Sequence, residues 1–178
     1  LASQLSQEHR QQALLATWPA LPLKIFGGVT ASEAAADAEG RLKVLAAIML
    51  LEIDIQTTDP DFQLNDLREK LSLPKLEMLS VDGLEVSQVS EVQMGRLPMD
   101  QLADKDLLAV YTRSALYGAV KALKASATEV ISRSDQLKDQ IDLAGVLGTL
   151  AELQGNNAEK LELLSKAQQA SVDQGRSP

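Results

Sequence analysis

The sequence contains no cysteine, one histidine and few aromatic residues. Without cysteine the chain can form no disulfide, no thiolate metal site and no cysteine nucleophile. With one histidine it cannot form a multi-histidine metal site, and we expect His9 to lie on the surface of a polar helix. Aromatic residues make up only 3% of the chain, so its core must be built mainly from Leu, Val, Ile and Ala, which favours helices.

The signature loops of common enzyme classes are also missing. Gly27-Gly28 is followed by neither a GxGxxG pattern nor a GKS or GKT triplet, and the sequence has no GxSxG elbow. The segment 59–66 is rich in oxygen ligands but lacks the central glycine and the closing glutamate of a calcium loop. We therefore predict that the protein is not an enzyme and that it has no metal site and no cofactor.

The longest apolar run is too short to cross a membrane. Eight apolar residues lie between Lys43 and Glu52, whereas a membrane-spanning helix needs about 20. Residues 51–56 alternate as a strand would, but the positions 45, 48, 51 and 55 follow helical spacing, and most of the run consists of strong helix formers. We predict a central core helix that is buried nearly all round.

The negative charge of the chain is concentrated in its middle. Residues 52–106 hold 13 Asp and Glu against 5 Lys and Arg, which accounts for the whole net charge of −8 because the remainder carries 12 of each. Such a segment repels nucleic-acid phosphates, so we expect no nucleic-acid binding. The pattern is typical of a solvated surface with several helix N-termini, or of a surface that meets a basic partner.

Capping signals and apolar spacing predict an all-α fold, a single domain of about five to seven helices over residues 1–170 with a frayed tail at 171–178. Residues 1–29 are expected to form an N-terminal helix and a proline-broken apolar linker. Thr30 and Glu33 have the spacing of a capping box. Asp59-Pro60 is expected to begin a further helix, with Leu64, Leu67 and Leu71 along its inward face. Later helices are expected over residues 104–133, over 137–154 and, after a turn and cap at Gly155-Asn156-Asn157, from about residue 157.

The two middle helices carry packing signals. In the helix over 104–133, Leu116 is expected to face inward beside a stripe of small residues, Ser114, Gly118, Ala122 and Ser126, which allows a close approach by another helix. Gly148 in the helix over 137–154 is likewise expected to allow close packing.

Residues 77–89 are the one plausible β element. Asp82-Gly83 between alternating residues indicates a small β-hairpin. A two-stranded hairpin is marginal by itself, so a helix–turn–helix piece around Gly83 is an alternative with nearly equal support.

Two groups of residues are candidate partner-binding sites. The predicted helix over 104–133 carries a basic edge on a segment, 107–128, that contains no acidic residue. Such an edge could bind an acidic protein surface, or it could pair with the chain's own acidic middle. The apolar linker is expected to lie across a core, or to serve as a docking strand for another protein. The six candidate residues are Arg113, Tyr117, Lys121, Lys124, Trp18 and Phe26.

These features favour a non-catalytic protein-interaction module, such as an adaptor, an assembly factor or a structural subunit. Its expected partner is another protein, with an acidic surface in the case of the basic edge, and a homo-oligomer is compatible with the sequence. The alternatives are a small-molecule binder or an enzyme that uses carboxylate and Lys/Arg/Tyr chemistry, and a peripheral lipid-binding protein. The sequence favours a cytoplasmic location only slightly, and its start at Leu1 suggests a processed or excised segment.

Overall fold

The computed structural model describes residues 12–56 and 64–173, and these residues form helices, turns and irregular segments without a β-strand. The predicted all-α class is therefore confirmed. The chain divides into two compact units, and each has its own hydrophobic core. The described part of the first unit comprises residues 12–55 and 64–76, and that of the second comprises residue 56 and residues 77–173. The predicted extent of one domain over 1–170 stays a prediction.

The first unit opens with a helical segment and the apolar linker. Residues 12–17 are helical, whereas the rest of the predicted N-terminal helix, including His9, lies outside the described residues. Two short 3-10 turns follow, η1 (Trp18–Ala20) and η2 (Lys24–Phe26). Gly27 and Gly28 then adopt left-handed φ angles of 79° and 89°, which glycine accepts without strain, and the chain turns back toward α2.

α2 (Ala31–Ala34) is a single turn that ends before the long helix α3 (Ala38–Gln56). The predicted capping box is present, because Thr30 Oγ1 accepts from the Glu33 N–H at 3.1 Å and the Glu33 carboxylate accepts from the Thr30 N–H at 2.8 Å. Gly40 lies so close to the Ala34 carbonyl that an added Cβ would stand 1.9 Å from its oxygen. Gly40 therefore permits a close approach in the first turn of α3.

The helix α4 (Asn65–Lys70) completes the first unit. The predicted inward positions Leu64, Leu67 and Leu71 are all buried, although the predicted start at Asp59-Pro60 lies outside the described residues. These three leucines, α2 and the inner side of α3 enclose a hydrophobic core. Its buried members are Phe26, Ala31, Ala34, Ala35, Val44, Ala47, Ile48, Leu64, Leu67, Leu71 and Leu73.

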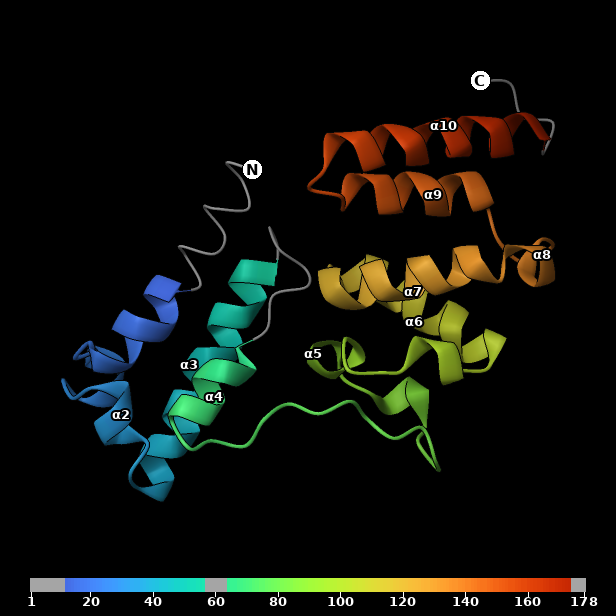
Figure 1. Ribbon diagram of the computed structural model, residues 1–178. Helices are drawn as coiled ribbons and strands as arrows, with labels where there is room; N and C mark the ends of the chain where they lie inside the picture. The colour runs from blue at the N-terminus through green and yellow to red at the C-terminus, as the bar shows by residue number, and fades with distance from the viewer. Residues whose placement is uncertain (1–11, 57–63, 174–178) are drawn as a thin grey trace. The chain divides into compact units, whose positions relative to one another are not determined.

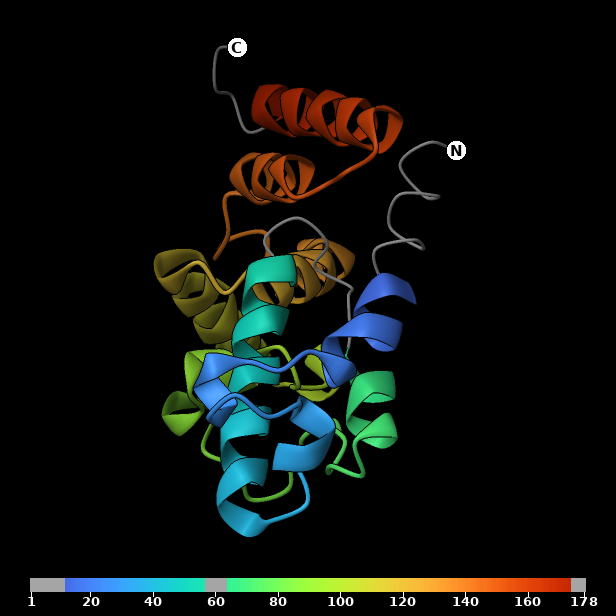
Figure 2. The same cartoon turned by 90° about the vertical axis from the view of Figure 1, so that its left-hand side faces the viewer.

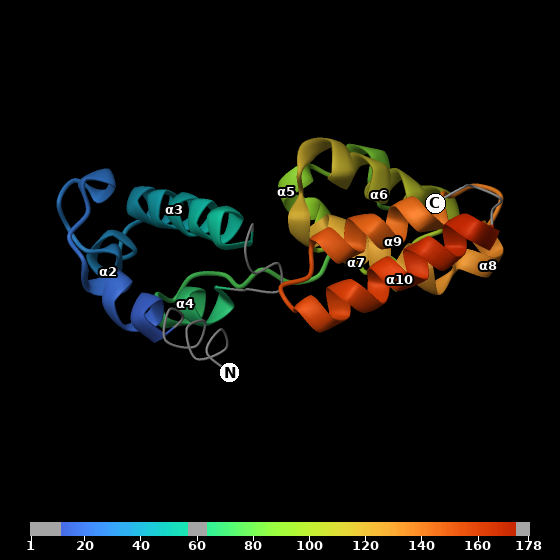
Figure 3. The same cartoon turned by 90° about the horizontal axis from the view of Figure 1, so that it is seen from above.

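α3 is a helix, as predicted, but the prediction that it is buried nearly all round is wrong. Val44 and Ile48 are fully buried, whereas Leu42 and Leu50 remain 69% and 63% exposed. Figure 3 shows the reason within the first unit, since α2 and α4 both lie to one side of α3. The core of the first unit thus buries one side of this apolar helix and leaves the other side exposed.

The second unit begins with an irregular segment instead of a hairpin. It contains η3 (Val86–Gln88), α5 (Glu91–Met94) and η4 (Met99–Gln101). A turn does form at Asp82-Gly83, with Gly83 at φ 69°, but no strands pair across it. The backbone N–H of Leu79 donates to the Arg96 carbonyl at 2.8 Å instead, so the segment pairs locally with the chain just after α5.

The predicted helix over 104–133 is two helices, α6 (Asp104–Tyr117) and α7 (Val120–Ser132). Gly118 takes a left-handed conformation with φ 66° and ends α6, because its N–H bonds back to the Ser114 carbonyl. The predicted small-residue stripe is divided by this turn. Ser114 on α6 is buried, as are Ala122 and Ser126 on α7, whereas Leu116, predicted to face inward, is exposed.

The predicted helix over 137–154 is also interrupted. α8 (Ser134–Leu137) is followed by a turn, and α9 (Leu143–Glu152) starts afresh with Asp142 capping the Gly145 N–H. Gly148, predicted to allow close packing, faces open space, since an added Cβ would meet nothing within 4 Å. α10 (Asn157–Asp173) begins at the predicted turn, where Asn156 accepts from the Ala158 N–H, and it continues into the predicted tail.

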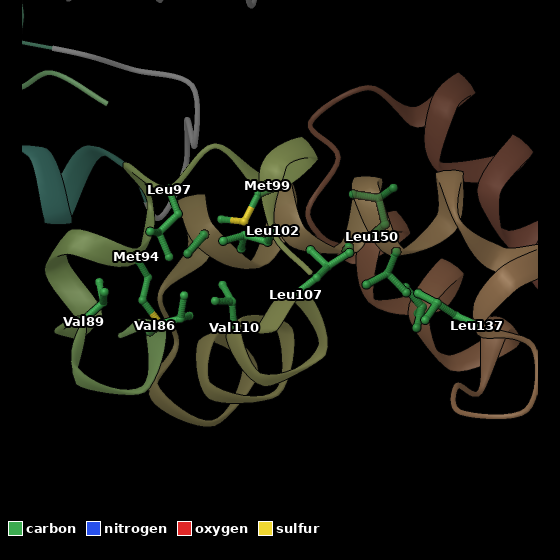
Figure 4. Close-up of a cluster of buried hydrophobic side chains, with 14 residues drawn as sticks. Val86, Val89, Met94, Leu97, Met99, Leu102, Leu107, Val110, Leu137 and Leu150 are labelled. Atoms are coloured by element: carbon green, nitrogen blue, oxygen red, sulfur yellow. The ribbon is translucent and has the colours of Figure 1, made fainter. Parts of the chain in front are cut away.

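The helices of the second unit pack in succession. α6 contacts α7, α7 contacts α9, and α9 contacts α10, which runs antiparallel to it after a short connection (Figures 1 and 2). The core lies between the irregular segment, α6 and α7, and reaches Leu137 and Leu150 (Figure 4). Aliphatic side chains and two methionines fill it, in keeping with the scarcity of aromatic residues.

Candidate interaction surfaces

The predicted basic edge does not form one continuous strip on a single helix. Arg113 and Tyr117 belong to α6, whereas Lys121 and Lys124 belong to α7, and the turn at Gly118 separates the two pairs. Tyr117, the last residue of α6, is 59% exposed. Both lysines are half-buried.

Arg113 makes hydrogen bonds within the second unit. Its guanidinium donates to the carbonyl oxygens of Val86 at 3.0 Å and Val89 at 2.7 Å, which lie at the two ends of the turn η3. Lys121 also packs internally, because its aliphatic stem lies so close to Gly95 that a Cβ added there would stand 3.2 Å from it. The partner-binding roles of Arg113, Tyr117, Lys121 and Lys124 stay predictions, and Arg113 also holds the turn η3 within the second unit.

Trp18 and Phe26, the candidates in the apolar linker, pack against each other. Their rings meet edge to face, with centroids 6.0 Å apart and an interplanar angle of 88°. Phe26 is buried in the first core, and Trp18 is half-buried against it. The linker therefore lies across the core of the first unit, the first of the two roles that its composition predicts.

Two further arginines, which the sequence did not single out, anchor the irregular segment. The guanidinium of Arg133 donates to the carbonyls of Leu102 and Asp100 at 2.7 and 2.9 Å, and it forms ion pairs with Asp104 and Glu129. These bonds raise the pKa of Arg133, chiefly the bond to Asp104 and next that to Glu129. Arg96 similarly donates to the Glu77 carbonyl at 2.7 Å. Part of the acidic middle is thus paired within the chain.

A buried ion pair joins α3 to α4 in the first unit. Arg68 is fully buried, and its guanidinium donates hydrogen bonds to both carboxylate oxygens of Glu52, with 2.6 Å between Nη2 and Oε2. Glu52 Oε1 also accepts from the Leu64 N–H at 3.0 Å. The Nε atom of Arg68 has no hydrogen-bond partner among the described residues. This arrangement gives Glu52 a structural role in the first unit.

The outer face of α3 is the densest exposed apolar surface on any described helix. We define it by Leu42, Ala46, Met49, Leu50 and Ile53, all of which are exposed. Their spacing of i, i+4, i+7, i+8 and i+11 places them on one side of the helix, opposite the buried residues of the same helix. Met49 and Ile53 are 38% and 49% exposed, so the surface is continuous along three turns.

Charged residues border the outer face of α3 along one edge. Lys43 pairs with Glu39 at 2.7 Å on the preceding turn, and both side chains are largely in solvent. This pair raises the pKa of Lys43, first through the hydrogen bond to Glu39. Asp54 is exposed near the other end of the helix. The outer face is thus an apolar strip whose border carries the Lys43–Glu39 ion pair toward one end and the acidic Asp54 toward the other.

Other exposed apolar side chains are sparser. α10 presents Leu161, Leu164 and Val172 to solvent, but Gln168 interrupts the row. Leu116 and Tyr117 are exposed together at the end of α6. Neither group is as continuous as the five-residue outer face of α3.

Residues 12–56 and 64–173 offer neither a metal cluster nor a membrane-spanning helix. Their Asp and Glu side chains include no group of three or more that could hold a metal ion. Among the helices of these residues, none is long and apolar enough to span a bilayer. The oxygen-rich segment 59–66 lies mostly outside the described residues.

No protein-family model, no curated protein and no solved structure matches this chain. Its function must therefore be inferred from its own residues. The sequence did not single out the outer face of α3, because a helix that is apolar all round has little amphipathic contrast. One signal was present: Lys43 and Asp54 both lie just beyond Leu50 on the helical wheel, on the same side of it, so this edge of α3 had to meet water.

Proposed function

We propose that the protein is a non-catalytic protein-interaction module, an adaptor, assembly factor or structural subunit, and that its partner covers the outer face of α3. The supporting observation is that α3 is apolar on two opposite sides but the core uses only one of them. Helices that are apolar all round are normally buried all round. Contiguous exposed apolar patches on soluble proteins commonly mark protein–protein contacts.

The size of the outer face suits a helix or a groove of a partner protein. Eleven residues of α-helix span about 16 Å, and anchors spaced over three turns are the pattern by which amphipathic helices dock. Covering four half-exposed large side chains would contribute on the order of 4–6 kcal/mol. This is enough for the centre of an interface, whose polar rim other residues must supply.

The residues of the basic edge, Arg113, Tyr117, Lys121 and Lys124, are secondary candidates for a contact with an acidic partner surface. Their support is weaker, because the edge is divided by Gly118 and both lysines are half-buried. The small-molecule and enzyme alternatives stay predictions for which no described contact gives specific support.

The test removes apolar character from the outer face without disturbing the core. The double variant Leu50→Gln and Ile53→Gln changes two exposed residues, and the double variant Leu161→Gln and Val172→Gln on α10 is the matched control. Immobilised wild type and both variants are exposed to native lysate from the source, after circular dichroism has shown equal helix content.

We expect the α3 variant to lose the proteins that the wild type and the α10 variant retain. If the α3 variant retains the same proteins in the same yield, the outer face is not the binding surface and the proposal fails.

A further inference from the structure

We infer that Asp82 is a site of spontaneous backbone modification, at which the aspartyl residue converts to an isoaspartyl residue through a cyclic imide formed with Gly83. The inference is independent of the proposed function, because it involves neither α3 nor a partner protein. It is carried by the sequence of the turn at Asp82-Gly83, by the exposure of both residues, and by the hydrogen bonds that close the turn around them.

The reaction needs no reagent other than water. The backbone nitrogen of Gly83 attacks Cγ of the protonated Asp82 carboxyl group, and the proton of the nitrogen leaves with the hydroxyl of the carboxyl group as water. Water then adds to one carbonyl of the imide, and a ring C–N bond breaks. Breaking the bond to Cγ restores aspartate, whereas breaking the bond to the backbone carbonyl carbon of Asp82 leaves the chain running through the side chain. The net change is an isomerisation without a change in mass.

The sequence offers this reaction its most favourable residue pair at a single place. Asp82-Gly83 is the one Asp-Gly pair in the chain, which has no Asn-Gly pair. Glycine favours the attack because no Cβ shields its nitrogen, whereas any other residue places a side chain beside the attacking atom. Glycine also allows the backbone rotation that brings the nitrogen to Cγ.

The structure leaves both reacting groups accessible. Asp82 and Gly83 are exposed, and a Cβ added at Gly83 would meet no heavy atom within 4 Å. No described residue accepts a hydrogen bond from the Gly83 N–H, because the turn is closed one residue later, where the Leu84 N–H donates to the Val81 carbonyl at 3.1 Å. The Asp82 carboxylate accepts from the Ser80 hydroxyl at 3.5 Å, a distance at which such a bond is weak.

Asp139 provides an internal comparison. It is also exposed in a turn, the one that follows α8, but the next residue is Gln140. The Gln140 N–H donates to the Leu137 carbonyl at 2.8 Å, so the nitrogen that would attack is already bonded and carries a side chain beside it. Exposure alone is thus shared by both aspartates, whereas a free glycine nitrogen is present only after Asp82.

The modification would reach the second core. An isoaspartyl residue adds one methylene to the backbone between Val81 and Leu84, and both of these residues pack partly buried against that core. The turn would therefore lengthen between two residues that the core holds. The carboxylate left on the isoaspartyl Cα is the group that isoaspartyl methyltransferases esterify with S-adenosylmethionine, so the modified chain would be a substrate for this class of enzyme.

The test incubates the full chain in water enriched in oxygen-18, at neutral pH and physiological temperature. Every passage through the imide adds one oxygen atom from the solvent, so the label records the reaction even where aspartate is restored. Trypsin then releases residues 76–96, in which Asp82 is the only aspartate. We expect this peptide to gain label and to separate into aspartyl and isoaspartyl forms by chromatography, while Asp139 stays unlabelled.

Two variants assign the label to its atoms. Asp82→Glu keeps the charge and the glycine but would need a larger and less favourable ring, and Gly83→Ala places a Cβ beside the attacking nitrogen. We expect both variants to lose most of the label in residues 76–96, after circular dichroism has shown a helix content equal to that of the wild type. Because Asp82→Glu retains Gly83, it tests the reaction even if Gly83→Ala disturbs the turn.

The chain unfolded in urea gives the rate without the fold, and we expect the folded chain to react at a similar rate. A folded chain that stays unlabelled while the unfolded chain reacts would overturn the inference, because the fold would then hold Asp82 away from the Gly83 nitrogen. Equal labelling of Asp139, or undiminished labelling of residues 76–96 in Asp82→Glu, would overturn it as well. None of these results bears on the proposed function of α3.

Discussion

The buried ion pair between Glu52 and Arg68 should be the most sensitive point of the first unit. Arg68 is fully buried, Glu52 is 7% exposed, and the pair links the last part of α3 to α4 through two charged hydrogen bonds. We consider Arg68→Met, which keeps much of the apolar stem but removes the guanidinium. The Glu52 carboxylate would then be buried without its cationic partner, while the Leu64 N–H still donates to it.

The expected cost follows from that uncompensated charge. Breaking a buried pair by removing one member typically lowers the free energy of unfolding by about 3–5 kcal/mol. The double variant Glu52→Gln with Arg68→Met removes both charges, while the amide oxygen introduced at position 52 can still accept from the Leu64 N–H. We expect the double variant to lie within about 1–2 kcal/mol of the wild type, since uncharged replacements of buried pairs are often nearly neutral.

The assay exploits the single tryptophan of the chain. Trp18 packs on Phe26 in the first core, so its fluorescence during urea unfolding reports on the first unit, whereas far-UV circular dichroism reports on both units. A double-mutant cycle built from the fluorescence transitions gives the coupling energy. A loss below about 1 kcal/mol for Arg68→Met, or a double variant as unstable as the sum of both single variants, would refute this account of the pair.

Three further predictions concern single positions. Gly40→Ala should lower stability by at least about 2 kcal/mol, because its Cβ would strike the Ala34 carbonyl, whereas Gly148→Ala should raise stability by about 0.5–1 kcal/mol in urea unfolding. Arg113→Met should cost about 2 kcal/mol through two lost charged hydrogen bonds, while Lys105→Met, exposed on the same helix, should be nearly silent by circular dichroism melting. Two hydrogen bonds from Thr30 lower the pKa of Glu33 below its ordinary value of 4.5, chiefly the one from the backbone N–H and next the one from the hydroxyl. The contribution of the capping box to stability is therefore fully present above pH 4.5 and is lost as the pH falls through the pKa of Glu33 in the folded protein. The stability difference between wild type and Glu33→Gln should therefore shrink on acidification, and a difference that persists unchanged at low pH would count against the capping box.

Local signals predicted the parts of this fold that depend on neighbouring residues. The Thr30–Glu33 capping box formed as expected, because both partners lie within one turn and need no distant contact. The turn before α10 formed for the same reason, with Asn156 as its cap. Leu64, Leu67 and Leu71 are buried because their spacing already defines one side of a helix.

The helix breaks were predicted poorly, because their cause is a choice of backbone conformation that the apolar pattern leaves open. Gly118 could have stayed in a helix at a cost of about 1 kcal/mol, but here it adopts φ 66° and folds α7 back against α6. The irregular segment 77–103 was equally hard to anticipate. It is held by Arg113 and Arg133, whose acceptors lie between 24 and 34 residues away along the chain, and no local signal reports such bonds.

The outer face of α3 shows a second limit of prediction from the sequence. The apolar run around Met49 correctly indicated a helix, and a helix with two apolar sides was expected to be covered on both. The described part of the first unit covers only one of these two sides. Its helices α2 and α4 are short, one turn and six residues, and both lie on the same side of α3 (Figure 3). Burial of α3 was thus overestimated because the sequence shows that a side is apolar but does not show whether the fold has an element to cover it.

This shortage of covering elements has an energetic consequence for the molecule. An uncovered apolar strip favours association of some kind, and a strip without borders would favour indiscriminate aggregation. On α3 the strip is bordered by Glu39, Lys43 and Asp54, which must each stay in contact with water or with an opposite charge. A partner that covers the strip must therefore leave these charges hydrated or present a counter-charge to them, and the border restricts the register in which any helix can dock. Under the proposed function, the same three residues that keep the edge of α3 hydrated also restrict which partner can bind there.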